Sequence, residues 1–405
     1  MIRSAADRYR DFLRLPDVAK MLAMALLTRM PIGTLSLSML LHVRARTGSF
    51  ALAGAAVGAF WIATAITAPI LGRIVDRRGP RALLIVTGTM FSLVLAVLVA
   101  AKPLDLSGTA MVVTAGVAGL FTPPITVLTR TMWRYRFDDE GRQTIAYALD
   151  GVLIELAFTI GPMLVALALA VATPTAAFAM AWCFCVAAVP LFLVSPALRY
   201  WRPDPHAERH LLGPLTEPRL LFVYGATFFF TFALGLLEIG YPGFAASIGS
   251  TPFAGVLLAV NSAGSAVGGL VYGAMHIGAA VDRLASRLLA LIVLPLALHA
   301  MTGSPGVLVA LAFTAGLLIA PVFVVFTTLV TSNAPSRYAT EAFTWSSTCI
   351  VGGVSAGNAL GGRLLETYGY SVVFAVSAGV ALVAALLALG TRMRRVQRRA
   401  TPSAE

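Results

Sequence analysis

Long apolar runs, separated by short polar segments, organise the whole chain. A run of about 18 or more apolar residues is long enough to cross the hydrocarbon core of a bilayer as an α-helix. Twelve such runs predict an all-α membrane protein with twelve transmembrane helices. The predicted spans are residues 21–43, 50–71, 83–101, 111–132, 145–171, 176–194, 220–248, 253–275, 284–301, 307–331, 343–360 and 372–389.

Composition supports a protein that lies in a membrane. Hydrophobic residues make up 58% of the 405 residues and charged residues only 12%, well below the roughly 25% charged residues of soluble domains. Most of the surface must therefore face lipid. Residues 1–20 carry mixed charges and lack the apolar core and small-residue cleavage site of a signal peptide, so the first span is expected to remain in the protein.

The net charge of +12 follows the predicted topology. An even number of spans places both termini on one side, and that side carries most of the arginines. The positive-inside rule therefore predicts that both termini are cytoplasmic, here in the cytoplasmic membrane of a bacterium. The charge needs no nucleic-acid partner. The opposite face has in its loops only Arg44, Arg46, Lys102 and Arg363.

Similar segments recur along the chain at a nearly constant offset. The motif Ala-Gly-Leu followed by a proline occurs at residues 118–124 and again at residues 315–321, and further matches share almost the same spacing. Such a repeat predicts two six-helix halves. The expected domains are an N-terminal bundle at residues 1–195, a central cytoplasmic loop at 196–219, a C-terminal bundle at 220–391 and a basic cytoplasmic tail at 392–405.

A charged turn between the second and third spans is the most specific motif. Its sequence, GRIVDRRGPR at residues 72–81, resembles the signature loop of the major facilitator superfamily, G-x-x-x-D-[RK]-x-G-[RK]-[RK], with a proline at one basic position. The resemblance implies a secondary transporter built of two pseudo-symmetric six-helix bundles. The matching residues are Gly72, Asp76, Arg77, Gly79 and Arg81, and Pro80 is the departure.

The resemblance also implies a gating role for this turn. In the family the aspartate braces the cytoplasmic contact between the halves near the start of span eleven, which lies here at residues 339–343. A carboxylate is favourable at such a helix start because free N–H groups and the helix dipole attract it. The second half has Ile277 where the first has Asp76. Because the aspartate is present in only one of the two repeated halves, a gating role is favoured over that of a simple connector. The alternative is that Asp76 and its arginines only set the topology.

Four charged residues inside the predicted spans are candidates for function, because each costs roughly 2.5 to 3.5 kcal/mol on insertion scales. They are Arg29 in span one, Asp150 and Glu155 in span five, and Glu238 in span seven. The two span-five carboxylates point about 140° apart on the helix, so they are not expected to act as a dyad. Arg29 and Glu155 lie at similar depth, which predicts an ion pair, with Asp150 as the alternative partner.

Two roles remain open for these charges. A static ion pair would only relieve the insertion costs. Alternatively, one carboxylate carries a coupling proton, and its proton affinity changes as the arginine moves away during transport. Glu155 is then the favoured carrier and Glu238 the second. The resemblance implies that spans one, four, seven and ten line the central cavity, which makes Arg29 and Glu238 cavity candidates.

Other residues add weaker indications. Gly161-Pro162 in span five matches part of the antiporter motif of proton-coupled drug exporters in the same superfamily, although a proline in a membrane helix is also tolerated as a simple kink. The cysteines, Cys183, Cys185 and Cys349, offer neither a disulfide framework nor a metal spacing, so no metal or cofactor is expected. Polar cavity candidates are Thr122 and Thr126 on one face of span four, Asn261 in span eight, and Trp345 and Asn358 in span eleven.

These observations predict a monomeric transporter that exports small amphipathic molecules in exchange for protons by alternating access. Its partners would be the substrate, protons and the lipid bilayer. A proton-linked or passive importer of sugars or organic acids is the alternative, in which Arg29 would be a counter-ion of the substrate. An enzyme is not expected, because the chain has no H-E-x-x-H motif, no nucleotide-binding phosphate loop and no nucleophile elbow with partners.

Overall fold

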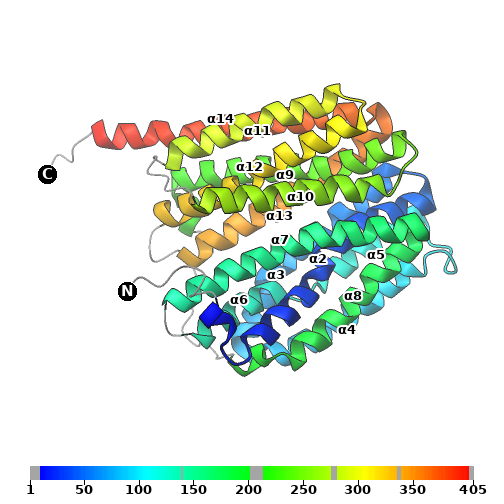
Figure 1. Cartoon of the computed structure of the whole chain (residues 1–405), viewed down its shortest axis with the longest axis horizontal. Helices are drawn as coiled ribbons and strands as arrows, with labels where there is room; N and C mark the ends of the chain where they lie inside the picture. The colour runs from blue at the N-terminus through cyan, green and yellow to red at the C-terminus, as the bar shows by residue number, and fades with distance from the viewer. Residues whose placement is uncertain (1–9, 138–139, 201–212, 275–280, 335–338, 401–405) are drawn as a thin grey trace.

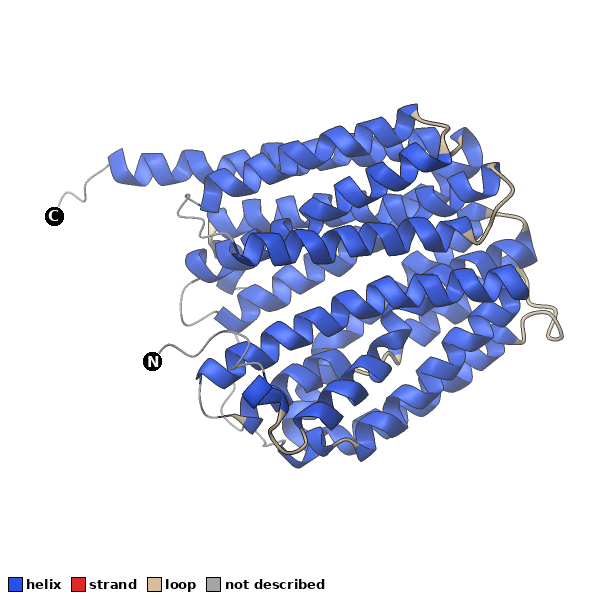
Figure 2. Cartoon of the chain, viewed as in Figure 1, coloured by secondary structure: helices blue, strands red, loops and turns tan. Residues whose placement is uncertain are grey.

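The computed structural model describes residues 10–137, 140–200, 213–274, 281–334 and 339–400, and within these ranges it contains helices and no strands (Figures 1 and 2). This confirms the all-α membrane fold. The helices are α2 (Val18–Thr47), α3 (Phe50–Arg78), α4 (Pro80–Val99), α5 (Gly108–Leu120), α6 (Ile125–Arg136), α7 (Glu140–Val171), α8 (Pro174–Val194), α9 (Pro218–Ser247), α10 (Phe253–Ala274), α11 (Val281–Met301), α12 (Pro305–Asn333), α13 (Ala339–Tyr368) and α14 (Tyr370–Ala400), with the short 3-10 helices η1 (Pro196–Tyr200) and η2 (Gly213–Thr216).

The helices form two bundles. Helices α2 to α8 pack together in the first half, α9 to α14 pack together in the second, and the halves meet mainly where α3 packs on α13 and α7 on α10 (Figure 1). Helix α2 begins and α14 ends at the same end of the molecule (Figure 1). The domain boundaries themselves stay a prediction, and residues 201–212 of the expected central loop lie outside the described residues.

Eleven segments of the described residues are long and apolar enough to cross a membrane, and one of them, Gly108–Thr129, runs from α5 into α6. The predicted eleventh span, residues 343–360, is also helical as part of α13, but this helix is too polar to count among them. Its buried polar residues include Ser346, Ser355 and Asn358. Since α13 packs against both α9 and α3, these groups face protein rather than lipid.

One predicted span differs from the structure. Span four is interrupted, since α5 ends at Leu120 and α6 begins at Ile125; two adjacent prolines, Pro123 and Pro124, cannot donate the backbone hydrogen bonds that a continuous helix needs. Thr122 therefore lies outside both helices and shares no helical face with Thr126. The expected tail at residues 392–405 is helical as far as residue 400, because α14 continues through it.

The predicted gating turn is unusually tight. Gly79 ends α3 with a φ of 84°, and Pro80 is the first residue of α4. Glycine adopts a positive φ without steric cost, and proline is preorganised for the first position of a helix. A proline in place of the basic residue of the family motif is therefore compatible with this turn.

The two halves touch closely at the end of the molecule opposite to the start of α2. A Cβ atom added to Gly54 of α3 would lie 2.5 Å from the carbonyl oxygen of Asn358 in α13, and one added to Gly255 of α10 would lie 2.4 Å from the carbonyl oxygen of Pro162 in α7. Small residues permit such contacts between membrane helices. From this end α7 and α10 diverge toward the end where α14 finishes (Figure 1). The structure is thus closed at the end away from α2's start.

A carboxylate from the second half caps a helix of the first half at this closed end. Oε2 of Glu366, near the end of α13, accepts a hydrogen bond from the Ser49 hydroxyl at 2.6 Å and one from the backbone N–H of Ala51 at 2.8 Å. Ser49 is the N-cap of α3. The hydrogen bond from Ser49, and then that from Ala51, hold the pKa of the Glu366 carboxyl below its usual value.

We expect Glu366→Gln to favour opening of this end by about two- to fivefold, the usual worth of an exposed charge at a helix N-terminus. In a cysteine-free background, Ser36→Cys in the cavity should react faster with a membrane-impermeant thiol reagent added from the closed side. The two hydrogen bonds of the closed form lower the pKa of the Glu366 carboxyl. Lowering the pH until this carboxyl is protonated should therefore weaken the closed form of the unaltered protein and leave the variant unaffected. Thr367→Ala, whose hydroxyl bonds only within α13, should react at the unaltered rate; equal rates for all three proteins would contradict the capping role.

Candidate transport site

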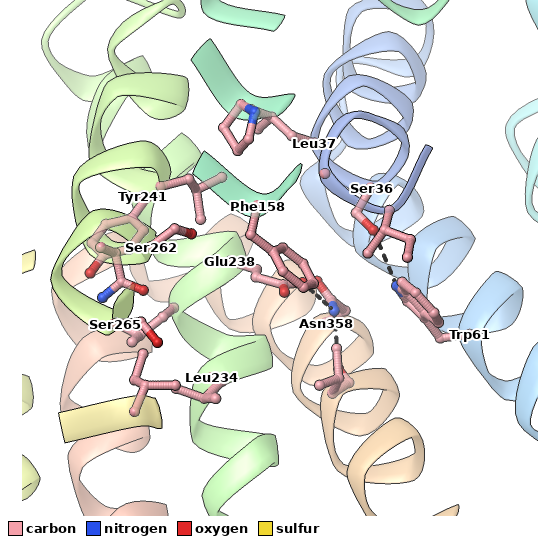
Figure 3. Close-up of a pocket in the computed structure, with 18 of the residues that line it drawn as sticks. Ser36, Leu37, Trp61, Phe158, Leu234, Glu238, Tyr241, Ser262, Ser265 and Asn358 are labelled. Carbon is pink, nitrogen blue, oxygen red and sulfur yellow. Dashed lines mark hydrogen bonds between the residues drawn. The ribbon is translucent and has the colours of Figure 1, made fainter. Parts of the chain in front are cut away.

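A cavity of about 330 Å³ lies between the two halves. Helices α2, α3 and α7 of the first half line it together with α9, α10, α12 and α13 of the second. Its volume is at the small end of the range for small-molecule sites, about 300 to 1,000 Å³. Most of the lining is apolar or aromatic, and its polar side chains are Ser36, Glu238, Tyr241, Asn261, Ser262, Ser265 and Asn358 (Figure 3).

Glu238 is the only charged residue among the described residues that line the cavity. Its Oε2 accepts a hydrogen bond from Nδ2 of Asn358 at 3.1 Å, and the same Nδ2 donates to the carbonyl oxygen of Val354 at 3.0 Å. Figure 3 shows Glu238 and Asn358 pointing toward each other from α9 and α13. Since both partners of Nδ2 are acceptors, the amide group of Asn358 must present its N–H groups to them.

Glycines allow these two short side chains to meet. A Cβ added to Gly235 of α9 would lie 2.4 Å from the carbonyl oxygen of Val354, and one added to Gly357 of α13 would lie 2.3 Å from the carbonyl oxygen of Phe232. The backbones of α9 and α13 therefore cross at a distance that only glycine permits. Local sequence thus sets the crossing that joins Glu238 to Asn358.

The opposite wall comes from the first half. Nε1 of Trp61 in α3 donates a hydrogen bond to the Ser36 hydroxyl in α2 at 3.2 Å. Gly161 of α7 packs directly on Gly33 of α2, since a Cβ added to Gly161 would lie 2.4 Å from the carbonyl carbon of Gly33. Pro162 lines the cavity. The Gly161-Pro162 element therefore has a packing role, and its part in antiport stays a prediction.

A buried ion pair lies close to the cavity. Nη2 of Arg29 in α2 is 2.5 Å from Oδ1 of Asp150 in α7, and the two side chains are 0% and 1% exposed. Neither residue lines the cavity itself. The structure thus pairs Arg29 with the carboxylate predicted as its alternative partner. The side chain of Glu155, the partner that the sequence favours, lies outside the described side chains, so its role stays a prediction.

The remaining predicted residues fall into two groups. Glu238, Asn261 and Asn358 line the cavity. Thr122, Thr126 and Trp345 are not among the lining residues: the Thr122 hydroxyl lies 3.1 Å from that of Thr64 in α3, and Trp345 packs against the core of the second half. Their role as cavity residues stays a prediction.

The gating residues lie around the turn between α3 and α4. Asp76 and Arg77 are in the last turn of α3, but their side chains lie outside the described ones. Arg81 is exposed, and Gly72 has no atom within 4 Å of where its Cβ would be. The contact expected between Asp76 and the start of α13 stays a prediction, because part of the segment before α13, residues 335–338, is not described.

Sequence reasoning missed several cavity residues, notably Trp61, Phe158, Tyr241 and Phe323. Tyr241 follows Glu238 by three residues and so shares its helix face, a signal that could have identified it. Trp61 and Phe158 belong to spans two and five, which are not among the spans that the family resemblance places in the cavity lining. Span four, expected in the lining, contributes none of the described lining residues.

Among the described residues no group of three or more histidine, cysteine, aspartate or glutamate side chains could hold a metal ion. The cysteines at positions 183, 185 and 349 are free thiols. What the architecture does provide is a small cavity between two bundles of apolar, membrane-length helices that pack closely at one end, an arrangement suited to a membrane transporter.

Comparison with known proteins identifies the family. The sequence model of the Major Facilitator Superfamily matches residues 21–223 and again residues 223–405, so the chain belongs to this superfamily of transporters. No curated protein matches the sequence. Among solved structures, a single-residue mutant of the nucleoside transporter NupG has a TM-score of 0.77 at 13% identity, covering 92% of this chain and 99% of that one. The human organic anion transporter MFSD10 (TETRAN) has a TM-score of 0.66 at 17% identity, covering 93% and 100%. These likenesses show the fold.

Proposed function

We propose that this protein exports small amphipathic molecules in exchange for protons. The observation that carries the proposal is the single carboxylate of Glu238 in a largely apolar cavity between the two halves. A charge in such surroundings is costly unless it is paired or neutralised. Glu238 would therefore hold either a proton or a substrate, and loading one would release the other. This exclusion is the physical basis of antiport.

Alternating access would arise from rocking of the halves around the cavity. With both termini in the cytoplasm of a bacterium, as the arginine distribution predicts, the structure is closed toward the outside. A monomer suffices for this cycle, because both halves belong to one chain. Helices α3 and α13 run antiparallel across the interface, since the start of α3 meets the end of α13.

This antiparallel packing supports a gating role for Asp76. At the closed end, Glu366 near the end of α13 caps the start of α3. Asp76, in the last turn of α3, would cap the start of α13 near Ala339 when the opposite end closes. Two carboxylates at opposite ends of the same helix pair would thus stabilise the two states in turn, each at a helix N-terminus.

We expect Asp76→Asn to insert normally and to favour the form described above, which is closed at the end away from α2's start. The cysteine Ser36→Cys should then react faster with a thiol reagent from the terminal side and more slowly from the other. Lys20→Gln, which removes an exposed charge near the start of α2 and outside the motif, is the control and should leave the accessibility unchanged. Unchanged accessibility from both sides, together with full transport, would leave Asp76 with a topological role only.

The function is tested in proteoliposomes that contain a pH-sensitive dye. Addition of a transported compound should change the internal pH, and an imposed pH gradient should drive the compound against its own gradient. Compounds are screened by class, with protein-free liposomes to correct for passive permeation of amines and acids. Transport without any proton movement would overturn the proposal.

A second candidate function is import of a neutral, hydroxyl-rich compound such as a sugar. The observation that favours it is the group of Trp61, Asn261, Ser262, Ser265 and Asn358 in one cavity, because polar hydrogen-bonding groups with an aromatic wall suit such a molecule. An organic acid is less compatible, since no basic residue is among the described lining residues. The same assay separates the two, because passive import would dissipate a sugar gradient with the dye unchanged.

A further inference from the structure

The polar groups of the cavity use most of their hydrogen-bond donors within the protein itself. Both N–H groups of the Asn358 amide are taken, by Glu238 and by the carbonyl of Val354. Nδ2 of Asn261 donates to the carbonyl of Ala312 at 2.9 Å. Nε1 of Trp61 donates to Ser36, and indole has no other polar group.

Tyr241 also uses its hydrogen-bond donor within the protein. Its hydroxyl lies 3.2 Å from Nε2 of His299, whose Nδ1 lies 2.6 Å from the carbonyl oxygen of Pro295. Nδ1 must donate to that carbonyl, so Nε2 of a neutral imidazole is an acceptor, and the Tyr241 hydroxyl donates to it. The phenolic oxygen keeps only acceptor capacity toward the cavity.

Acceptors, by contrast, remain available. Oε1 of Glu238 receives no hydrogen bond from the described residues, and Glu238 is partly exposed although it lies in the middle of α9. The amide oxygens of Asn261 and Asn358 are likewise not used by described side chains. The hydroxyls of Ser262 and Ser265 can serve in either sense. A cavity of this kind pairs a ligand that brings donors more completely than one that brings only acceptors, for which the serine hydroxyls and the second N–H of Asn261 are the remaining donors.

We infer that the substrate is a small organic monocation, a protonated amine on an apolar body, whose ammonium group donates to Glu238. This deepens the proposed function. The ammonium supplies donors that match the open acceptors and a charge that neutralises the carboxylate inside the cavity. The apolar body lies against Trp61 and Phe158, the aromatic residues that the first half contributes. The cavity of about 330 Å³ limits this body to about one ring with a short chain.

The inference is tested with three probes of nearly equal size that differ in charge: 2-phenylethylamine, which is protonated at neutral pH, 2-phenylethanol and 3-phenylpropionate. Binding to the purified protein is measured at equilibrium by tryptophan fluorescence, with Trp61→Phe as the blank. We expect the amine to bind about tenfold more tightly than the alcohol, which is the usual advantage of a charge-assisted hydrogen bond. The carboxylate should bind least.

Glu238→Gln should weaken binding of the amine about tenfold and leave that of the alcohol unchanged, which also shows that the variant is folded. Asp105→Asn, which removes an exposed carboxylate from a loop, should change neither. Any one of four results would overturn the inference: equal binding of amine and alcohol, preference for the carboxylate, unaltered selectivity in Glu238→Gln, or no binding of the amine at about 10 mM. That concentration fills a site with a millimolar dissociation constant. Selective amine binding without proton movement in liposomes would instead refute only the proton coupling.

Discussion

Arg29→Ala should lower the free energy of unfolding by about 3 to 5 kcal/mol, the usual cost of breaking a buried ion pair by removing one partner. The carboxylate of Asp150 would keep its place inside the bundle, 1% exposed, without the guanidinium that lies 2.5 Å away. Unfolding in detergent, followed by tryptophan fluorescence, measures the change. Lys102→Ala, which removes an exposed cation from a loop, should change the same free energy by less than about 0.5 kcal/mol.

Second variants show which carboxylate is the partner. Asp150→Asn added to Arg29→Ala should recover most of the lost stability, because the carboxylate that lost the guanidinium is replaced by a neutral group of the same shape. Glu155→Gln added to Arg29→Ala should recover little. The reverse pattern would support the pairing with Glu155 that the sequence favours, and equal recovery by both variants would mean that Arg29 serves both carboxylates.

The membrane helices could be predicted because the bilayer imposes a simple rule on the sequence. Without water in the hydrocarbon core, backbone groups must bond within each helix, and the side chains that face lipid must be apolar. The two prolines at positions 123 and 124 indicate a break in the helix, but the apolar run around them has the length of one continuous span, so the break was not predicted. Helix α13 is more polar than a lipid-facing helix can be. It packs against α3 and α9, and this contact with protein allows buried polar residues such as Asn358 and Ser355.

The site was predicted only in part, for geometric reasons. Glu238 could be found because a carboxylate in an apolar span is rare and costly. The sequence could not decide the partner of Arg29, because the choice depended on the depth of each carboxylate in the membrane. Asp150 and Glu155 lie five residues apart, about 7.5 Å along a helix. The span ends inferred from apolar runs are uncertain by about the same length.

The aromatic wall was not predictable from local pattern. Trp61 and Phe158 reach the cavity from α3 and α7, helices that also form the interface between the halves. Whether such helices line a cavity depends on how the two bundles are tilted, which is a property of the conformational state rather than of any one segment. Glycine pairs such as Gly235 and Gly357 carried more information, because they mark where the backbones cross.

Glu238→Gln should abolish accumulation of substrate driven by a pH gradient. With one proton exchanged per cycle, a gradient of two pH units supports a concentration ratio of up to about a hundredfold, since each pH unit is worth 1.36 kcal/mol per proton, and the variant should lose this ratio. A glutamine keeps the hydrogen bond with Asn358 and the size of the side chain but cannot bind and release a proton. The halves can still rock, so gradient-independent exchange of an uncharged compound should persist.

The measurement is uptake into inverted vesicles with an imposed pH gradient, at substrate concentrations high enough to offset weaker binding. Glu238→Asp should retain some coupling, because the carboxyl group remains, and Asp105→Asn should transport like the unaltered protein. If Glu238→Gln still accumulates substrate in response to pH, Glu238 is not the proton carrier. Repeating the experiment with Glu155→Gln then decides whether the carboxylate favoured from the sequence carries the proton, and the double variant decides whether either does.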